Sequence, residues 1–173
     1  MTLIVIHGVE STGKTTLGRR LAGTFGAPFL PEYGRAFCEI RGTDCSEEDL
    51  LVIGRAQQAN IETALAERPI VISDTDSLTT AAWAQMTLGK VPPALFAARK
   101  ADLYLHCAPD TLFVEDGIRM FGDPTERLRF DAIARSILHQ ASVSMVEVSG
   151  SWDERYRTAA AAIERLLRRA HQS

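Results

Sequence analysis

The chain has 173 residues, which is enough for one domain with a full hydrophobic core and too few for two domains of ordinary size. Hydrophobic residues make up 46% and charged residues 24%, the balance of a globular protein rather than a disordered or fibrous one. The net charge of −3 and the pI of about 5.8 disfavour a general electrostatic hold on nucleic acid, so we expect a small-molecule partner and no nucleic acid.

The chain shows no sign of export or membrane insertion. No apolar run approaches the roughly 18 residues of a membrane span, and the opening run LIVI is too short for a signal peptide. The cysteines, Cys38, Cys45 and Cys107, are odd in number and form no Cys-x-x-Cys pair, which argues against a disulfide framework and a zinc site. We therefore expect a cytoplasmic protein without membrane contact, and nothing in the sequence indicates a protein partner.

The first predicted unit is a strand, a glycine loop and a helix. The apolar run TLIVI (residues 2–6) predicts a strand buried on both faces. The loop Gly8–Gly13 leads from it into a helix with an apolar stripe. A brief second strand is expected around Phe29, stopped by Pro31.

A long helix is predicted to follow Ser46, because Asp49 stands three residues on as in a capping box, and to run to about Arg68. The apolar run 69–73 predicts the next buried strand, and a helix is expected over 77–88.

The second half of the chain continues the alternation of strands and helices. Strands are predicted over 102–107 and 144–148, a helix starts at Asp123–Pro124, and a last helix runs from Asp153 to His171. The order predicts a mainly parallel five-stranded sheet with helices on both faces, in one domain over residues 1–173.

Gly8, Gly13, Lys14 and Thr15 complete the pattern G-x-x-x-x-G-K-[ST] between a predicted strand and a predicted helix. In this motif backbone N–H groups and the lysine surround phosphates, while the hydroxyl reaches Mg²⁺. ATP is favoured over GTP, because the chain has no Asn-Lys-x-Asp motif. The residues expected to bind the nucleotide are Gly8, Glu10, Ser11, Thr12, Gly13, Lys14, Thr15 and Thr16.

Carboxylates follow two of the predicted strands, where parallel sheets place their ligands. Asp74 could hold the Mg²⁺ shell, accept the proton of a substrate hydroxyl, or both. Asp76 is either a substrate ligand or the cap of the helix 77–88. Glu32 either orients a sugar hydroxyl or is a solvated loop acid paired with Arg35.

Three further side chains are candidates for the substrate pocket. Gln57 lies on the buried stripe of the long helix, where its amide either bonds backbone or reads a substrate. Trp83 belongs either to the core, which is favoured, or to the pocket wall. Tyr33 is the better candidate for stacking on a substrate ring, because it lies beside Glu32.

The glycine-bearing segment EDGIRMFGD is typical of a mobile lid that brings positive charge onto a transferring phosphate. We expect Arg119 in this segment to act there, whereas Arg127 and Arg129, on the following helix, are expected to be solvated.

The stretches GVESTGKTTL, PEYGRAF, DTDSLTTAAW, DLYLHCAPD and EDGIRMFGD occur in the order and with the spacing of NadR-type ribosylnicotinamide kinases. The resemblance covers nearly the whole chain from the phosphate loop to the last helix. It implies a P-loop NTPase fold like that of nucleoside and nucleotide kinases, with an arginine-bearing lid. It also implies that ATP phosphorylates the ribose 5′-hydroxyl of nicotinamide riboside, giving nicotinamide mononucleotide.

The resemblance also implies roles for individual residues. Thr15 and Asp74 would hold Mg²⁺, and catalysis would depend on Lys14, Asp74 and Arg119. The chain departs from the family at Pro31, where an aromatic residue is expected. Together with the pocket candidates above, the substrate-binding residues would be Glu32, Tyr33, Arg35, Gln57, Asp74 and Asp76.

Two other functions stay open. A deoxynucleoside kinase would use an acid after the second strand and a glutamine on the next long helix, which correspond in type to Glu32 and Gln57. A nucleotide-sensing module would bind ATP and a riboside without turnover.

Overall fold

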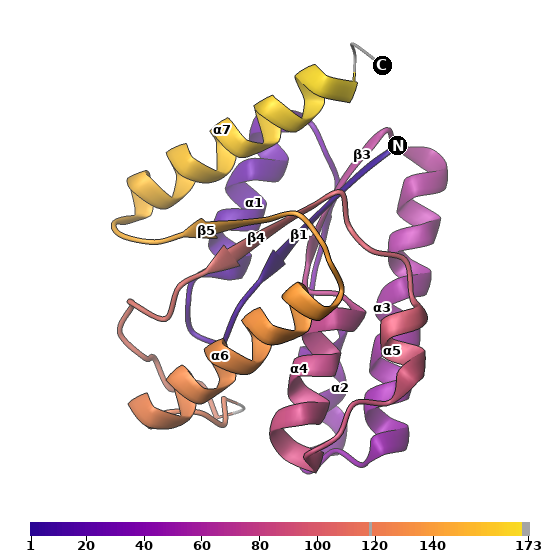
Figure 1. The fold of residues 1–173 in the computed structure, drawn as a ribbon, viewed down its shortest axis with the longest axis vertical. Coiled ribbons are helices and arrows are strands. Elements are labelled where there is room, and N and C mark those ends of the chain that lie inside the picture. Colours follow the sequence, from indigo (N-terminus) through magenta and orange to yellow (C-terminus); the bar gives the residue numbers. More distant parts are fainter. Residues whose placement is uncertain (118, 171–173) are drawn as a thin grey trace.

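A computed structural model describes residues 1–117 and 119–170 of the chain. Within these residues five strands form one all-parallel sheet in the order β2-β3-β1-β4-β5, as Figure 1 shows. The strands are β1 (Thr2–His7), β2 (Phe29–Leu30), β3 (Ile70–Asp74), β4 (Leu103–Cys107) and β5 (Met145–Val148). This confirms the predicted fold class and the predicted strands, including the brief one at Phe29.

Seven helices accompany the sheet in the described ranges. They are α1 (Lys14–Phe25), α2 (Tyr33–Arg41), α3 (Glu47–Glu67), α4 (Ser77–Leu88), α5 (Pro93–Ala97), α6 (Pro124–Gln140) and α7 (Trp152–Ala170). No helix in this part of the chain is long and apolar enough to span a bilayer.

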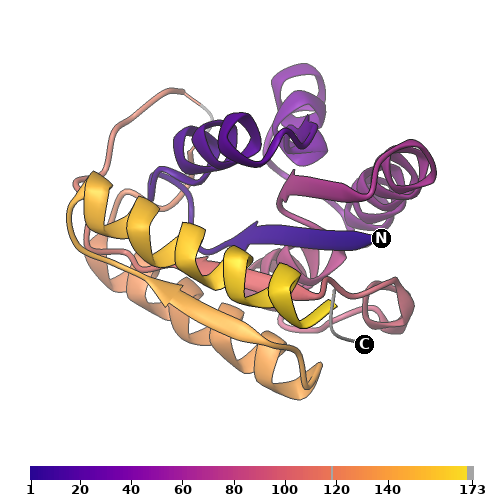
Figure 2. The same ribbon diagram turned by 90° about the horizontal axis from the view of Figure 1, so that it is seen from above.

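The sheet is covered on both faces, and β1 shows how the chain achieves this. Its side chains alternate, so Leu3 and Val5 enter one core while Ile4 and Ile6 enter the other. The first core is formed with α3, α4 and α6, and the second with α1 and α7 (Figure 2). A strand buried on both faces is nearly all apolar, which explains the unbroken apolar run TLIVI.

The helix starts that the sequence marks with caps are confirmed. Ser46 and Asp49 form the predicted capping box of α3. Asp123 accepts hydrogen bonds from the N–H groups of Thr125 and Glu126 at the start of α6. The end of the last helix, predicted at His171, lies outside the described residues.

Two helices were not predicted. α5 has only five residues, so it carries too short a pattern to detect. α2 has no fully buried residue, and its short apolar stripe, with Tyr33 and Phe37 packed against the larger core, covers only two turns and was missed. α2 follows β2 directly and forms one wall of the site described below.

α1 packs closely on the sheet because Gly18 has no side chain. A Cβ at Gly18 would collide with the ring of Phe29 and lie 2.9 Å from Cδ1 of Ile6. Gly23, on the opposite side of the same helix, has nothing within 4 Å of such a Cβ. The close approach matters for function, because α1 begins at the phosphate loop.

These two glycines give a matched pair of variants. Gly23→Ala should raise the free energy of unfolding by about 0.5–1 kcal/mol, because alanine favours a helix. Gly18→Ala should lower it by about 1–2 kcal/mol, because the clash outweighs the same gain. Urea denaturation of both variants measures the two changes. Equal changes of the same sign would show that α1 does not depend on this contact.

Candidate functional site

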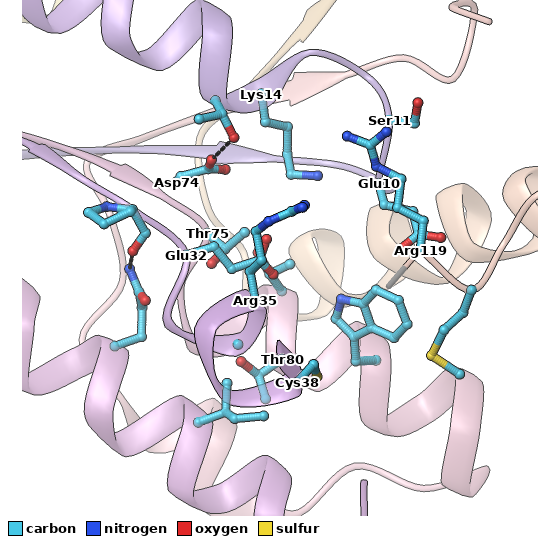
Figure 3. A pocket seen from close by; sticks show the side chains of 18 of the residues that line it. Glu10, Ser11, Lys14, Glu32, Arg35, Cys38, Asp74, Thr75, Thr80 and Arg119 are labelled. Atoms are coloured by element: carbon cyan, nitrogen blue, oxygen red, sulfur yellow. Dashed lines mark hydrogen bonds between the residues drawn. The ribbon is translucent and has the colours of Figure 1, made fainter. Parts of the chain in front are cut away.

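A cavity of about 440 Å³ lies at the carboxyl edge of the sheet, where parallel α/β folds bind their ligands (Figure 3). The phosphate loop and the end of β3 form one side, and residues of α2, α3 and α4 form the other. The polar side chains that line it include Lys14, Glu32, Arg35, Gln57, Asp74 and Arg119. The cavity therefore brings together most of the side chains singled out in the sequence.

The phosphate loop has the backbone conformation that its glycines permit. Gly8 has φ of +123°, and a Cβ there would lie 2.6 Å from the carbonyl oxygen of Cys107. Gly13 has φ of +79° and occupies the position before the first residue of α1. The ammonium of Lys14 folds back over the loop and donates to the carbonyl of Val9 at 2.9 Å. The loop thus presents a helix N-terminus and a buried cation to the cavity.

Thr15 and Asp74 join the phosphate loop to the adjacent strand. The Thr15 hydroxyl donates to Oδ2 of Asp74 at 2.5 Å. Among the described residues Oδ1 of Asp74 finds no hydrogen-bond partner, although it is buried. Burial raises the pKa of Asp74, while Lys14 and the bond from Thr15 oppose that rise. A hydroxyl and a carboxylate oxygen at this place suit a hard divalent cation.

Glu32 is a second carboxyl on the cavity wall, at the start of α2. Burial raises the pKa of Glu32 to about 7, the charge of Asp74 adds to the rise, and Lys14 opposes it. Because the two carboxyls share one cavity, they titrate as a pair. Glu32 can therefore exchange a proton near neutral pH, which a solvated loop acid could not.

Gln57 acts within the fold, as the structural alternative predicted. Its amide nitrogen donates to Ser73 Oγ at 2.9 Å and to the carbonyl of Pro31 at 3.3 Å. Its amide oxygen accepts from the N–H of Tyr33 at 2.8 Å. These bonds hold the residues on both sides of Glu32 and so fix where that carboxyl lies.

Asp76 has a structural role as the cap of α4. This corrects the expectation that it binds substrate. Its Oδ1 accepts from the N–H groups of Leu78 and Thr79, which makes it the cap of α4. Its Oδ2 accepts from the Tyr104 hydroxyl at 2.6 Å. Both oxygens of this buried carboxylate are engaged, which leaves it to cap the helix.

The aromatic wall of the cavity differs from the expected one. Tyr33 packs against the larger core and is not among the residues that line the cavity. Trp83 lines the cavity, the less favoured of its two expected places, and also packs against the larger core. Its ring stacks on Phe121 with centroids 5.0 Å apart and planes 18° apart. Helical spacing alone could not separate a core position from a wall position here.

The lid segment, residues 111–117 and 119–123, lies between β4 and α6 and borders the cavity through Arg119 and Met120. Arg119 contributes to the wall, as expected of a lid arginine. Arg127 is not solvated as predicted: it is buried, and its Nη1 donates to the carbonyl of Glu10 at 2.8 Å. This long-range bond leaves no trace in the local sequence.

Sequence reasoning also missed two cysteines of the wall. Cys38 and Cys45 both line the cavity, and their sulfur atoms lie 3.9 Å apart. Cys38 stands one helical turn after Arg35, so α2, had it been predicted, would have placed both on one face.

Comparison with known proteins places this site in a family. Residues 3–155 match the AAA domain family. The chain belongs to that family. It is also 29% identical over 163 residues to the trifunctional NAD biosynthesis/regulator protein NadR of Salmonella typhimurium and of Escherichia coli. The alignment covers 88% of this AAA domain chain but only 40% of either NadR, so the chain spans less than half the length of these curated relatives.

Solved structures agree with this relationship. A NadR structure in complex with NR superposes with a TM-score of 0.82 at 26% identity, covering 95% of this chain and 51% of that one. A NadR structure with NAD and AMP-PNP gives 0.79 at 24% identity, with 95% and 49% coverage. Thymidylate kinase from Ehrlichia chaffeensis gives 0.70 at 15% identity, covering 95% and 98%. The AAA domain therefore has a kinase-like P-loop fold, and the predicted resemblance to NadR is confirmed.

The raised pKa of Glu32 predicts a pH-dependent stability for this AAA domain. A carboxyl whose pKa is about 7 when folded and about 4.5 when unfolded holds more protons in the native state between these values. The free energy of unfolding should therefore fall as the pH rises through that window. Glu32→Gln removes this titration. The free energy of unfolding of the variant, relative to that of wild type, should therefore grow by about 1 kcal/mol from pH 4.5 to pH 7. The value is smaller than the full pKa shift implies, because solvent in the open cavity screens part of the burial penalty.

Urea denaturation of wild type and Glu32→Gln at a series of pH values measures this difference. A difference that stays constant across the window would show that the Glu32 carboxyl titrates like a solvated acid.

Proposed function

We propose that this chain is an ATP-dependent kinase, a single domain over residues 1–173, that phosphorylates nicotinamide riboside on its ribose 5′-hydroxyl. The observation that carries the proposal is one cavity with a phosphate loop on one side and the carboxyls of Glu32 and Asp74 beside it. The NadR relatives, one of them solved with NR, support the choice of riboside. The product would be nicotinamide mononucleotide.

On the nucleotide side, the loop N–H groups and Lys14 would hold the β- and γ-phosphates of ATP. Lys14 can exchange its bond to the Val9 carbonyl for phosphate oxygens, since both are acceptors near the same ammonium. Arg119 on the lid would add positive charge where negative charge builds up on the transferring group.

The residues present fit a magnesium ion. The Thr15 hydroxyl and the buried Asp74 oxygen, which has no partner in the described part of the chain, are the hard donors that Mg²⁺ prefers. When bound, the ion would neutralise phosphate charge. Asp74 would then hold the ion, so Glu32 is the carboxyl that remains to contact the acceptor substrate.

On the acceptor side, we propose that Glu32 orients the ribose and accepts the 5′-hydroxyl proton. A pKa of about 7 suits a general base at neutral pH, because it is often ionised yet basic enough to take the proton. The pyridinium ring would meet the Trp83 side of the wall, where an aromatic face attracts a cation. Trp83 would thereby supply the ring contact that Pro31 cannot.

The runner-up, a deoxynucleoside kinase, is weakened by Gln57. Its amide would have to read the base, but the structure uses both amide atoms in bonds to Ser73, Pro31 and Tyr33. The likeness to a thymidylate kinase at 15% identity speaks for the fold alone.

Nicotinamide riboside should be phosphorylated with a kcat/KM at least about tenfold above that of any deoxynucleoside, a difference of roughly 1.4 kcal/mol in transition-state binding. ADP release with nicotinamide riboside, deoxycytidine, deoxyguanosine and thymidine measures this, with Lys14→Ala as the inactive control. A deoxynucleoside in first place would favour the runner-up. Saturable binding of ATP and riboside without ADP release would favour the sensing module.

Asp74→Asn should lower kcat by at least about 100-fold while the KM for the riboside changes little, because charge at this position counts most in the transition state. Steady-state kinetics on a sample whose far-UV circular dichroism matches wild type give the two parameters. If KM alone rises, Asp74 is a ground-state binding residue and the assignment of the metal side fails.

A further inference from the structure

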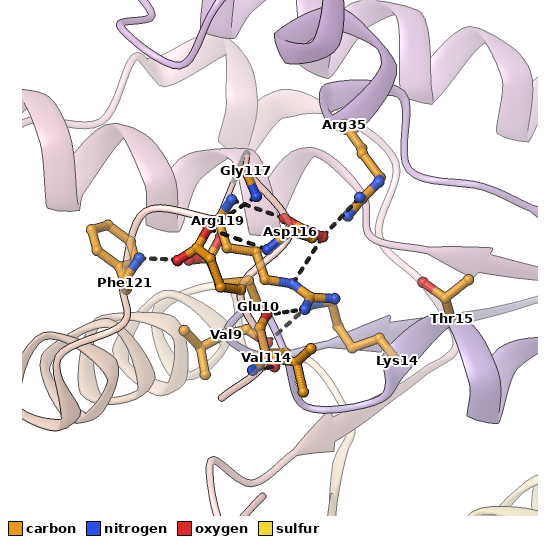
Figure 4. A network of polar contacts seen from close by, with 12 residues as sticks. Val9, Glu10, Lys14, Thr15, Arg35, Val114, Asp116, Gly117, Arg119 and Phe121 are labelled. Carbon is orange, nitrogen blue, oxygen red and sulfur yellow. Dashed lines mark hydrogen bonds and ion pairs between the residues drawn. The ribbon is translucent and has the colours of Figure 1, made fainter. Parts of the chain in front are cut away.

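The lid segment is fastened to the phosphate loop near both of its ends. Near its beginning, the Ser11 hydroxyl accepts from the N–H of Val114 at 2.9 Å. Near its end, the Glu10 carboxylate accepts from the N–H of Phe121 at 2.6 Å (Figure 4). Arg119 lies between these two anchors. These two bonds fix the path of the lid backbone, but neither one contacts the long side chain of Arg119.

Two acceptors orient that side chain: the carbonyl of Val114, which accepts from Nη1 of Arg119, and the carboxylate of Asp116. Oδ2 of Asp116 lies 3.2 Å from Nε of Arg119, and its Oδ1 accepts from the Arg119 N–H at 3.2 Å. The same Oδ2 accepts from Nη2 of Arg35, a residue of α2, at 2.8 Å (Figure 4). One carboxylate therefore joins a lid arginine to an arginine of the acceptor wall.

The Asp116 carboxylate offsets the repulsion between the positive charges of Arg35 and Arg119. Arg35 and Arg119 both line the cavity, and two guanidinium groups drawn to one point repel each other unless an anion lies between them. The hydrogen bond that Arg35 donates to Asp116 is the largest cause of the raised pKa of Arg35. The Asp116 and Arg119 side chains are only 21% and 23% exposed, so the pair is less screened than an ordinary surface ion pair.

Arg35 has a second acidic neighbour that provides a comparison. Glu39 lies one turn along α2, and its Oε1 is 3.4 Å from Nε of Arg35. Its side chain is 50% exposed, and both partners belong to the same helix. Removing Glu39 therefore takes an acid from Arg35 without touching the lid.

We propose that Asp116 is a positioning residue that ties Arg119 of the lid to Arg35 of α2. Arg119 then points into the cavity only while α2 forms the acceptor wall, so occupation of the acceptor side and placement of the lid arginine are linked. This rests on the proposed kinase function for its catalytic meaning, although the tie itself is a property of the chain. Its loss should lower kcat and leave ATP binding nearly intact, because the phosphate loop keeps its own contacts.

Trypsin cleavage after Arg119 tests the tie without any substrate. In Asp116→Ala the Arg119 side chain is released from its ion pair, so trypsin should cleave the peptide bond after Arg119 about threefold faster than in wild type. A partly exposed ion pair contributes enough energy for a change of this size. Glu39→Ala should cleave at the wild-type rate, and Asp116→Glu should restore much of the protection. Mass spectrometry of the fragment ending at Arg119 follows the rate. Equal rates in Asp116→Ala and wild type would overturn the proposal.

A double-mutant cycle tests the catalytic consequence. Asp116→Ala and Arg35→Ala should each lower kcat about tenfold, and the double variant should be little worse than either, because both break one tie. The KM for ATP should stay within about twofold of wild type, and Glu39→Ala should keep the wild-type kcat. Additive losses, or a wild-type kcat in Asp116→Ala, would overturn the proposal.

The two arms separate the inference from the proposed function. If wild type phosphorylates no riboside, the proposed function fails, and the cleavage rates alone decide whether Asp116 holds the lid. If wild type is active and the cleavage rates are equal, Asp116 has no positioning role.

Discussion

The hydrogen bond between Thr15 and Asp74 is the contact on which the rest of the site depends. β3 lies beside β1 in parallel, with Ile6 in register with Asp74, so β3 ends next to the phosphate loop although three helices and β2 lie between the two strands in the chain. Right-handed crossovers between parallel strands bring such ends to one edge of a sheet. The contact fixes the phosphate loop relative to Asp74, and the other oxygen of this buried carboxyl has no partner among the described residues.

Around this contact the chain uses buried polar groups as a scaffold. Gln57 holds the backbone on both sides of Glu32, and Asp76 fixes the start of α4, which carries Trp83. Each of these groups is fully engaged, as buried polar groups must be to avoid a large desolvation cost. The carboxyls that face the cavity are different: burial raises the pKa values of Glu32 and Asp74, which is typical of groups that exchange protons or bind cations.

Much of the fold was accessible from the sequence because its signals are local. The G-x-x-x-x-G-K-[ST] pattern, the apolar runs and the caps at Ser46 and Asp123 each depend on a few neighbouring residues. The side chains whose places were not predicted are held by residues far away in the sequence. Arg127 was expected in solvent but reaches the phosphate loop, and the bridge from Asp116 to Arg35 joins α2 to the lid. The resemblance placed Arg35 on the substrate side, but the helix that carries it together with Cys38 has no fully buried residue and was not predicted.

The central claim is that the phosphate held at Lys14 passes to a primary hydroxyl in the same cavity. ³¹P NMR of the protein with Mg²⁺, ATP and nicotinamide riboside tests this most directly, because it identifies the phosphate product. We predict ADP together with a new phosphomonoester resonance, coupled to the two 5′-methylene protons and absent with Lys14→Ala. Inorganic phosphate as the sole product, or a monoester coupled to a single ribose-ring proton, would contradict the account.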